Sequence, residues 1–259
     1  MQPDYKNWVP KGMVTSFFAA TSISSFALGM SLISDTVKKP VKIALATVTG
    51  ACAAYSAFCI NWYNTFSYNG KKKFAKHIID SIAEYVDLPD GGIGLDVGCG
   101  SGALAISCAK RNPNASMIGL DRWGKEYASF TKPLCESNAI AEGVEKNTSF
   151  VQGDACKLDF PDEYFDAVTS NYVYHNIHTL DHQKLIYETL RVLKKGGTFA
   201  IHDLYTGTKY GDMCKLVQKL KDEGYEKVEL LDTTNGLFMT KKEATTLFLN
   251  GSALLVGKK

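Results

Sequence analysis

The residues whose types and spacing point most directly to chemistry lie in residues 93–102, which read IGLDVGCGSG. Apolar residues alternate along the first half of this stretch and predict a buried strand of a parallel sheet. Three glycines spaced two apart follow, and the small residues of 103–109 then begin a helix. A glycine turn of this kind lets a ligand lie against the backbone at a helix N-terminus. Asp96, near the strand end, is placed to accept a hydrogen bond from a ligand ammonium.

The glycine pattern alone fits two kinds of nucleotide site. Gly98-x-Gly100-x-x-Ala103 also satisfies the dinucleotide fingerprint G-x-G-x-x-[GA], which is typical of nicotinamide enzymes. The glycines by themselves therefore leave an NAD-binding oxidoreductase open.

Two acids further along the chain distinguish these alternatives. Residues 117–121 predict a second strand that ends in Asp121, a position suited to binding a ribose diol. Residues 148–151 predict a third strand, and Asp154 and Ala155 follow it. This last pair offers a carboxylate and a backbone N–H to the edge of an adenine.

Together these three motifs resemble those of the class I S-adenosylmethionine-dependent methyltransferases. The resemblance covers roughly residues 70 to 259 and includes two later motifs, FPDEYFDAV at 160–168 and LRVLKKGGTF at 190–199. It is strongest to the small-molecule and lipid-quinone branch. It implies an α/β fold, a Rossmann-like doubly wound seven-stranded sheet with an antiparallel last strand at 253–256.

The resemblance also implies the cofactor, S-adenosylmethionine, and the residues that hold it. The methionine end is expected near Asp96 and the first two glycines, the ribose at Asp121, and the adenine at Asp154. Trp123 is expected to pack its indole on the adenosine, or else to be an ordinary aromatic at a helix start. The expected cofactor-binding residues are Asp96, Gly98, Cys99, Gly100, Gly102, Asp121, Arg122, Trp123, Asp154, Ala155 and Asn171.

Methyl transfer is an in-line displacement, so the protein must mainly align the reactants and exclude water. A base is needed only where the acceptor must lose a proton. His175 is the first candidate and His202 the second, because histidine titrates near neutral pH. His175 could instead only pack beside the site. Because neighbours on a strand point to opposite sides, only one of His202 and Asp203 is expected to face the pocket.

The amino-acid composition argues against nucleic-acid binding and against a metal site. The 259 residues carry 29 Lys and Arg against 27 Asp and Glu, and no basic and aromatic stripe supports nucleic-acid binding. Seven cysteines without metal-like spacing predict reduced thiols in a cytosolic environment and no metal site.

The N-terminal part contains two uncharged runs. Residues 13–34 form a run of 22, long enough to cross a bilayer, and residues 43–62 form a second. We expect a polar N-terminus at 1–12, a transmembrane helical hairpin at 13–64 and a catalytic domain at 65–259. A soluble helical appendage and a cleaved signal peptide are the alternatives. Small residues at four-residue spacing, including Gly29 and Gly50, would let the two helices approach closely.

More lysines flank the two ends of the hairpin than lie in the segment that connects its helices. Because positive charge favours the cytoplasmic side, this predicts that both ends of the hairpin are cytoplasmic. The expected location is the cell membrane, with a cytoplasmic catalytic domain and a possible homo-oligomer through the hairpin. Two helices are predicted in the catalytic domain. One covers residues 74–88, and the other has an apolar face at Ile186, Leu190 and Leu193 and ends at Gly196.

The expected function is S-adenosylmethionine-dependent methyl transfer to a small-molecule or membrane-associated lipid or prenylated acceptor. The alternatives are a non-catalytic membrane module that binds S-adenosylmethionine or S-adenosylhomocysteine, and the NAD-binding oxidoreductase.

Overall fold

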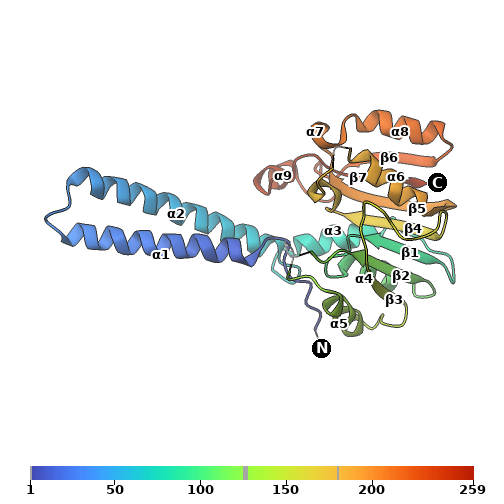
Figure 1. Ribbon diagram of the computed structural model, residues 1–259, viewed down its shortest axis with the longest axis horizontal. Helices are drawn as coiled ribbons and strands as arrows, with labels where there is room; N and C mark the ends of the chain where they lie inside the picture. Colours follow the sequence, from blue (N-terminus) through green and yellow to red (C-terminus); the bar gives the residue numbers. More distant parts are fainter. Residues whose placement is uncertain (1, 125–127, 180) are drawn as a thin grey trace. The chain divides into compact units, whose positions relative to one another are not determined.

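The structure is a computed structural model that describes residues 2–124, 128–179 and 181–259. The chain folds into two units (Figure 1). One consists of Lys6–Lys76, and the other of Met1–Tyr5 together with His77–Lys259.

The larger unit contains a seven-stranded sheet in the order β3-β2-β1-β4-β5-β7-β6. The first five strands are parallel, and β7 runs antiparallel between β5 and β6. This confirms the Rossmann-like fold with an antiparallel last strand. The strands are β1 (Ile93–Val97), β2 (Ser116–Asp121), β3 (Thr148–Gln152), β4 (Phe165–Asn171), β5 (Leu193–Leu204), β6 (Glu226–Asp232) and β7 (Ser252–Lys258).

Helices connect the strands, as parallel pairing requires. Those of this unit begin or end at local sequence signals. α4 starts after Gly102, whose φ is 82°, and α5 starts after Thr131, whose hydroxyl accepts from the Leu134 N–H. The helices are α3 (Phe74–Ala83), α4 (Ala103–Arg111), α5 (Lys132–Glu142), the 3-10 turn η2 (Tyr174–Asn176), α6 (Gln183–Arg191), α7 (Gly207–Tyr210), α8 (Met213–Asp222) and α9 (Lys241–Thr246).

The helix expected over 74–88 is shorter, because α3 ends at Ala83. Asn112, beyond the end of α4, explains the difference. Its side chain accepts from the Leu88 N–H at 2.9 Å and donates to the Val86 carbonyl at 3.3 Å. These bonds replace the helical ones and hold the segment as a loop that leads into β1.

The helix expected to reach Gly196 also ends earlier, at Arg191. Leu193 is the first residue of β5, where it pairs with Phe165 of β4. The released carbonyls at the helix end are satisfied by the last residue of the chain. Lys259 Nζ donates to the Leu190 and Leu193 carbonyls at 2.8 and 2.9 Å, as a cation at a helix C-terminus should.

The smaller unit contains a helical hairpin made of α1 (Lys11–Ile33) and α2 (Lys39–Phe66). The helices contact each other through Thr21 and Ser56, whose hydroxyls lie 2.8 Å apart, and through the rings of Phe17 and Tyr55. Side chains on the outer surface are large and apolar, and Ile23, Phe26 and Ile33 are each at least 70% exposed. Both helices are long and apolar enough to cross a membrane.

Gly29 and Gly50 do not mediate the contact that their spacing predicts. A Cβ on either would meet nothing within 4 Å. The covered positions of α2 are instead Thr49, Cys52, Ser56 and Cys59, which recur every three or four residues. The predicted stripe of Ala46, Gly50 and Ala54 on α2 is therefore exposed, because a 3.6-residue period admits more than one stripe of small residues. Thr21, of the predicted stripe on α1, does lie at the contact with Ser56.

Serine and threonine are frequent in α1, and most of their hydroxyls are hydrogen-bonded within the hairpin. Those of Ser16, Thr21 and Ser22 each donate to the carbonyl four residues earlier, at 2.8 to 3.0 Å. Such bonds satisfy the hydroxyl within its own helix. A helix rich in serine can thus keep an effectively apolar surface.

The N-terminal segment up to Tyr5 belongs to the larger unit. Asn138 of α5, which is only 1% exposed, accepts from the Asp4 N–H at 2.7 Å and donates to the Asp4 carbonyl at 3.1 Å. The same amide nitrogen donates to the Ser101 carbonyl in the glycine loop at 3.0 Å. One side chain therefore attaches both the N-terminal segment and the glycine loop to α5.

Replacing Asn138 by alanine should lower the free energy of unfolding by roughly 1–3 kcal/mol, because buried backbone groups lose their partners. Urea unfolding followed by circular dichroism measures the change. Asn114→Ala is the matched control, since Asn114 pairs with Asp90 at the exposed surface, and should change the value by at most about 0.5 kcal/mol. Equal effects of the two substitutions would contradict the structural role of Asn138.

Candidate cofactor and acceptor site

The turn after β1 depends on glycine for backbone reasons. Gly98, Gly100 and Gly102 have φ values of 75°, 55° and 82°, which other residues adopt at a cost. Gly98 is required for a second reason, since a Cβ there would lie 2.3 Å from a Val173 methyl. The loop after β4 therefore presses directly on the glycine turn.

Asp121, the last residue of β2, is bound to this turn. Its Oδ2 accepts from the Gly100 N–H at 2.8 Å, and its Oδ1 accepts from the Trp123 N–H at 2.7 Å. Each carboxylate oxygen can accept a further hydrogen bond, and the residue is only half-buried. Two hydroxyls of a ribose therefore have acceptors here.

Trp123 lies against the glycine turn. Its indole Nε1 donates to the Gly100 carbonyl at 3.0 Å, and its backbone φ of 46° is uncommon for a residue with a side chain. Cys135 of α5 donates to the same carbonyl, with Sγ at 3.2 Å. Side chains of Asp121, Trp123 and Cys135 thus hold the glycine turn through hydrogen bonds to Gly100.

Asp96 is buried in β1, with 1% of its surface exposed. Its Oδ1 accepts from the Thr169 hydroxyl at 2.9 Å, while Oδ2 has no hydrogen-bond partner among the described residues. Burial raises the pKa of Asp96 to about 7, against the opposing effect of the Thr169 bond. A buried carboxylate oxygen without a partner fits a ligand ammonium, which would supply both a donor and a charge.

The remaining expected cofactor residues lie around the same loops. Asp154 is exposed, and its Oδ1 accepts from the Cys156 N–H at 2.8 Å in the turn that also contains Ala155. The Arg122 carbonyl accepts from the Gln152 side chain. Cys99 is buried beside Asp96, and burial raises the pKa of its thiol well above the ordinary value, so this cysteine is a packing residue of the turn.

These residues fit S-adenosylmethionine. β1, β2 and β3 are adjacent and parallel, so the loops at their carboxyl ends share one edge of the sheet. Asp96 would hold the ammonium, Asp121 the ribose, and the Asp154–Ala155 turn the adenine. Among the described residues, no group of three or more His, Cys, Asp or Glu side chains is arranged to hold a metal ion.

His175 lies in η2, after β4, and is oriented by Asp203 near the end of β5. Its ring Nδ1 lies 2.5 Å from Asp203 Oδ1, and its side chain is 19% exposed whereas Asp203 is fully buried. Backbone N–H groups of Tyr174 and Leu204 also donate to this carboxylate, at 2.8 and 2.7 Å. Because a carboxylate accepts the Nδ1 proton, Nε2 is the ring nitrogen able to take a proton.

His202 is fully buried, and both its ring nitrogens have partners. Nδ1 lies 2.8 Å from Asn171 Oδ1, and Nε2 lies 3.0 Å from the Thr233 hydroxyl. Burial lowers the pKa of His202 to about 3, so the ring is neutral across the physiological range. His202 and Asn171 thus bind each other across β5 and β4, where they are register partners. Asp203, its neighbour, is the one that faces His175.

Three residues of this arrangement do not stand out in the sequence. Thr169 meets Asp96 through strand register, Asp203 meets His175 from a distant strand, and Val173 covers Gly98. The alternation of side chains along β5 is the only sequence signal that separates Asp203 from His202.

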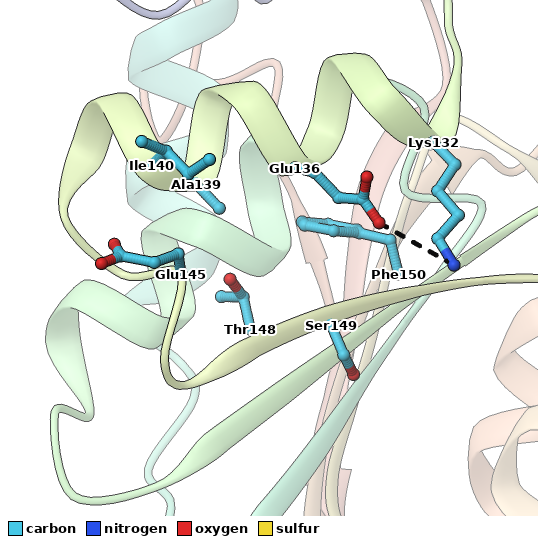
Figure 2. Close-up of a pocket in the computed structure, with 8 residues that line it drawn as sticks. All are labelled: Lys132, Glu136, Ala139, Ile140, Glu145, Thr148, Ser149 and Phe150. Carbon is cyan, nitrogen blue, oxygen red and sulfur yellow. Dashed lines mark ion pairs between the residues drawn. The ribbon is translucent and has the colours of Figure 1, made fainter.

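A surface cavity of about 270 Å³ lies elsewhere, between α5 and β3 (Figure 2). Figure 2 shows the Phe150 ring beside the ion pair of Lys132 with Glu136, and the side chains of Ala139 and Ile140 on the same helix. The cavity is lined by Lys132, Glu136, Ala139, Ile140, Glu145, Thr148, Ser149 and Phe150. None of these belongs to the expected cofactor set, so the cavity is distinct from the site above.

Residues 95–201 match the family model described as a methyltransferase domain. These residues form a domain similar to the methyltransferase family. Its first matched residue follows the start of β1, and its last lies in β5, so the match spans the glycine turn, Asp121, Asp154 and His175. Methyltransferases of this family use S-adenosylmethionine, and this favours the methyltransferase interpretation of the glycines over the nicotinamide one.

Curated relatives match part of this domain. The sterol 24-C-methyltransferase of Aspergillus fumigatus is 33% identical over 122 residues, which are 47% of this chain and 30% of the relative. The demethylmenaquinone methyltransferase of Thermus thermophilus is 35% identical over 107 residues, 41% of this chain and 44% of the relative. The chain therefore spans less than half the length of these relatives.

Solved structures show the same fold at low identity. Geranyl diphosphate C-methyltransferase of Streptomyces coelicolor, in complex with Mg²⁺, geranyl diphosphate and S-adenosylhomocysteine, has a TM-score of 0.53 and 12% identity, covering 71% of this chain and 79% of that one. The [4+2]-cyclase SpnF has a TM-score of 0.54 and 22% identity, with 71% and 81% covered. Because a cyclase shares the fold, function must be argued from the site itself.

The buried Asp96 carboxylate predicts a pH-dependent affinity for S-adenosylhomocysteine. Its folded pKa of about 7 exceeds the ordinary 3.8, so the carboxylate that binds an ammonium is lost as pH falls through 7. Affinity measured by calorimetry should drop about tenfold between pH 8 and pH 6. Asp96→Asn should bind weakly at both pH values.

The same raised pKa lowers stability at high pH. The charged form is disfavoured only in the folded state, so the free energy of unfolding falls as pH rises from about 4 to about 7 and stays lowered above that. Asp96→Asn removes this penalty and should raise the apo-protein Tm more at pH 8 than at pH 5. Asp159→Asn, at an exposed position, is the control, and a lower Tm for Asp96→Asn at pH 8 would contradict the assignment.

Proposed function

We propose that the protein is a membrane-anchored methyltransferase that transfers a methyl group from S-adenosylmethionine to a small-molecule or lipid acceptor. The observation that carries this proposal is the His175–Asp203 pair, in which ring Nδ1 lies 2.5 Å from an oxygen of the buried carboxylate and Nε2 is left as the nitrogen that can accept a proton. His175 lies in η2 after β4 and Asp203 near the end of β5, at the same edge of the sheet as the loops that fit the cofactor.

The chain's own residues perform three tasks in this reaction. Asp96, Asp121 and the Asp154 turn bind and orient the cofactor, which supplies a methyl group already activated on a sulfonium. Val173, which directly precedes η2, forms one side of the site, because its side chain packs on Gly98. His175 removes the proton that an acceptor hydroxyl or acidic carbon must lose, while Asp203 fixes the ring tautomer and stabilises the imidazolium that forms.

The names of the relatives support an apolar acceptor. They act on sterols, on demethylmenaquinone and, among structures of the same fold, on geranyl diphosphate. All three molecules carry large hydrocarbon parts. An acceptor of this kind would reach the enzyme from a lipid phase.

The smaller unit supports attachment to a membrane. α1 and α2 have 23 and 28 residues, or about 34 and 42 Å at 1.5 Å per residue, against a hydrocarbon core of about 30 Å. Only 6% and 11% of their most apolar windows are buried, whereas a core helix of a soluble protein would be mostly covered. Charged residues lie only at the hairpin's ends and connection.

Orientation follows from the lysines. Lys6, Lys11 and residues 71–76 provide six lysines beside the hairpin's ends, against three in the connection at Lys38, Lys39 and Lys42. The positive-inside rule then places both ends, and the catalytic unit, in the cytoplasm, where S-adenosylmethionine is made. The protein would thus be a cell-membrane enzyme with a cytoplasmic active site.

A membrane module that only binds the cofactor would have the same cofactor residues but would not need His175. Incubating membrane extract with methyl-labelled S-adenosylmethionine and the full-length protein should label a product, whose mass identifies the acceptor. Asp121→Ala, which cannot hold the ribose, serves as the inactive control. No labelled lipid, quinone, protein or small molecule would favour the binding module.

His175→Ala should reduce turnover by roughly 10²-fold or more, because the acceptor proton loses its base. Binding of S-adenosylhomocysteine should stay nearly unchanged in calorimetry. His178→Ala is the matched control, as His178 is an exposed histidine three residues away, and should keep wild-type turnover. Parallel losses of cofactor affinity and rate in His175→Ala would mean that the ring shapes the pocket and moves no proton.

The protein should remain in membranes after washes with high salt and with carbonate, because apolar burial is not weakened by salt. A cysteine introduced at Val37 should react with an impermeant reagent from outside intact cells, and one at Ser252 should not. Release by salt alone would show that the hairpin is a soluble appendage.

A further inference from the structure

The charges of the chain are divided unevenly between its two units. The smaller unit, Lys6–Lys76, contains nine lysines and a single acidic residue, Asp35, which gives it a net charge of +8. Because the whole chain carries only +2, the remaining residues, which include the candidate site, carry −6. An anionic membrane surface would therefore attract the smaller unit and repel the larger one.

Most of the positive charge lies at the end of the hairpin where the chain enters α1 and leaves α2. The lysine collar at this end consists of Lys11 and the consecutive Lys71, Lys72 and Lys73, all of which are exposed. Asp35 lies in the connection between the helices, at the opposite end. No carboxylate of the smaller unit therefore neutralises the lysine collar.

Contacts within the smaller unit bring the two parts of the lysine collar together. Asn7 Nδ2 donates to the Tyr63 carbonyl at 2.8 Å and attaches the segment before α1 to the last turns of α2. The rings of Trp8 and Phe66 lie 5.7 Å apart, and those of Phe66 and Phe74 lie 5.4 Å apart. Lysines from before and after the hairpin thus flank one cluster of aromatic rings.

The depth expected for the lysine collar is that of lipid phosphates. Residues 43–62 carry no charge and rise about 30 Å as a helix, which matches the hydrocarbon core of a bilayer. Trp62 and Tyr63 end this run, and such rings are enriched at the boundary between hydrocarbon and head groups. Lysines just beyond that boundary lie in the head-group layer, which their long side chains can reach.

We propose that the lysine collar binds the phosphate groups of anionic phospholipids on the cytoplasmic side of the membrane. This inference rests on the proposed membrane attachment and adds a lipid-binding surface outside the methyl-transfer site. A lysine ammonium binds phosphate oxygens as a point charge. A zwitterionic lipid also carries a phosphate, but its own cation competes for that phosphate and repels the lysines. The lysine collar would hold the acidic catalytic unit at a surface that otherwise repels it.

Two of the three tryptophans, Trp8 and Trp62, lie beside the lysine collar and serve as local reporters. Full-length protein is reconstituted into phosphatidylcholine vesicles that contain increasing fractions of brominated phosphatidylglycerol or brominated phosphatidylcholine. Brominated lipids quench the fluorescence of a tryptophan that they contact, so the two curves give the relative binding constant of the anionic lipid. Trp123→Phe is present in every sample and removes the signal of the larger unit.

Phosphatidylglycerol should bind about fivefold more tightly than phosphatidylcholine, since a lysine at an anionic membrane surface contributes about this factor. In 1 M NaCl, where the Debye length is about 3 Å, the preference should fall below about twofold. This salt dependence tests the proposal without any change in the lysine collar. Replacing Lys71, Lys72 and Lys73 together by glutamine should remove most of the preference at low salt as well.

The matched control replaces Lys38, Lys39 and Lys42 together by glutamine, which removes the same charge from the opposite end of the hairpin. The control should keep the preference, because the two tryptophans report on the end that carries the lysine collar. A preference that survives in the variant of the lysine collar, or that is lost equally in the control, would overturn the proposal.

Equal quenching of wild type by the two lipids would also overturn the proposal, and would leave the lysines only the role of orienting the hairpin. Failure of the proposed function gives different results. If neither lipid quenches the tryptophans, the hairpin is not in the bilayer, and both membrane attachment and lipid binding fail. If wild type prefers phosphatidylglycerol but transfers no methyl label to any fraction of membrane extract, the lysine collar stands and methyl transfer fails.

Discussion

A single buried carboxylate, that of Asp203, joins the two loops on which the site depends. It accepts the ring N–H of His175 and the backbone N–H groups of Tyr174 and Leu204, and so fixes the η2 turn against the end of β5. Val173 immediately precedes this turn and lies where a Cβ of Gly98 would be. The position of the His175 ring and the shape of the glycine turn therefore both depend on this interaction, and a change at Asp203 should disturb both.

The site is also where the fold leaves polar groups unsatisfied. Asp96 Oδ2 and both His182 ring nitrogens are buried without hydrogen-bond partners among the described residues, and they lie on β1 and on the loop after β4. The Thr198 hydroxyl of β5 and the Thr49 hydroxyl of α2 are buried without partners as well, whereas Asn138 makes three hydrogen bonds to backbone groups. Natural proteins break local rules mainly where function requires it, and lower stability is the usual consequence.

The helical hairpin must accommodate polar side chains in an apolar environment. An apolar environment penalises every unpaired polar group, yet α1 contains many serines and threonines. Their hydroxyls bond to carbonyls of their own helix or, at Thr21, to Ser56 of the other helix. The outer surface is left to large apolar side chains such as Phe18 and Phe26. Composition alone makes α1 look less apolar than the surface it presents.

The sequence by itself determined the glycine turn after β1 and the acids at the ends of the next two strands. These features are local, since each is written in fewer than about ten consecutive residues with the period of a strand or a helix. Tertiary structure decided which side chains from different segments contact each other. Thr169 meets Asp96 and Asp203 meets His175 only because the registers of β1, β4 and β5 bring them together, and α3 ends early because Asn112, from another helix, takes its backbone groups. The site roles of these residues stay predictions, but their placement follows from contacts between residues at least 24 positions apart in the sequence, which no local pattern encodes.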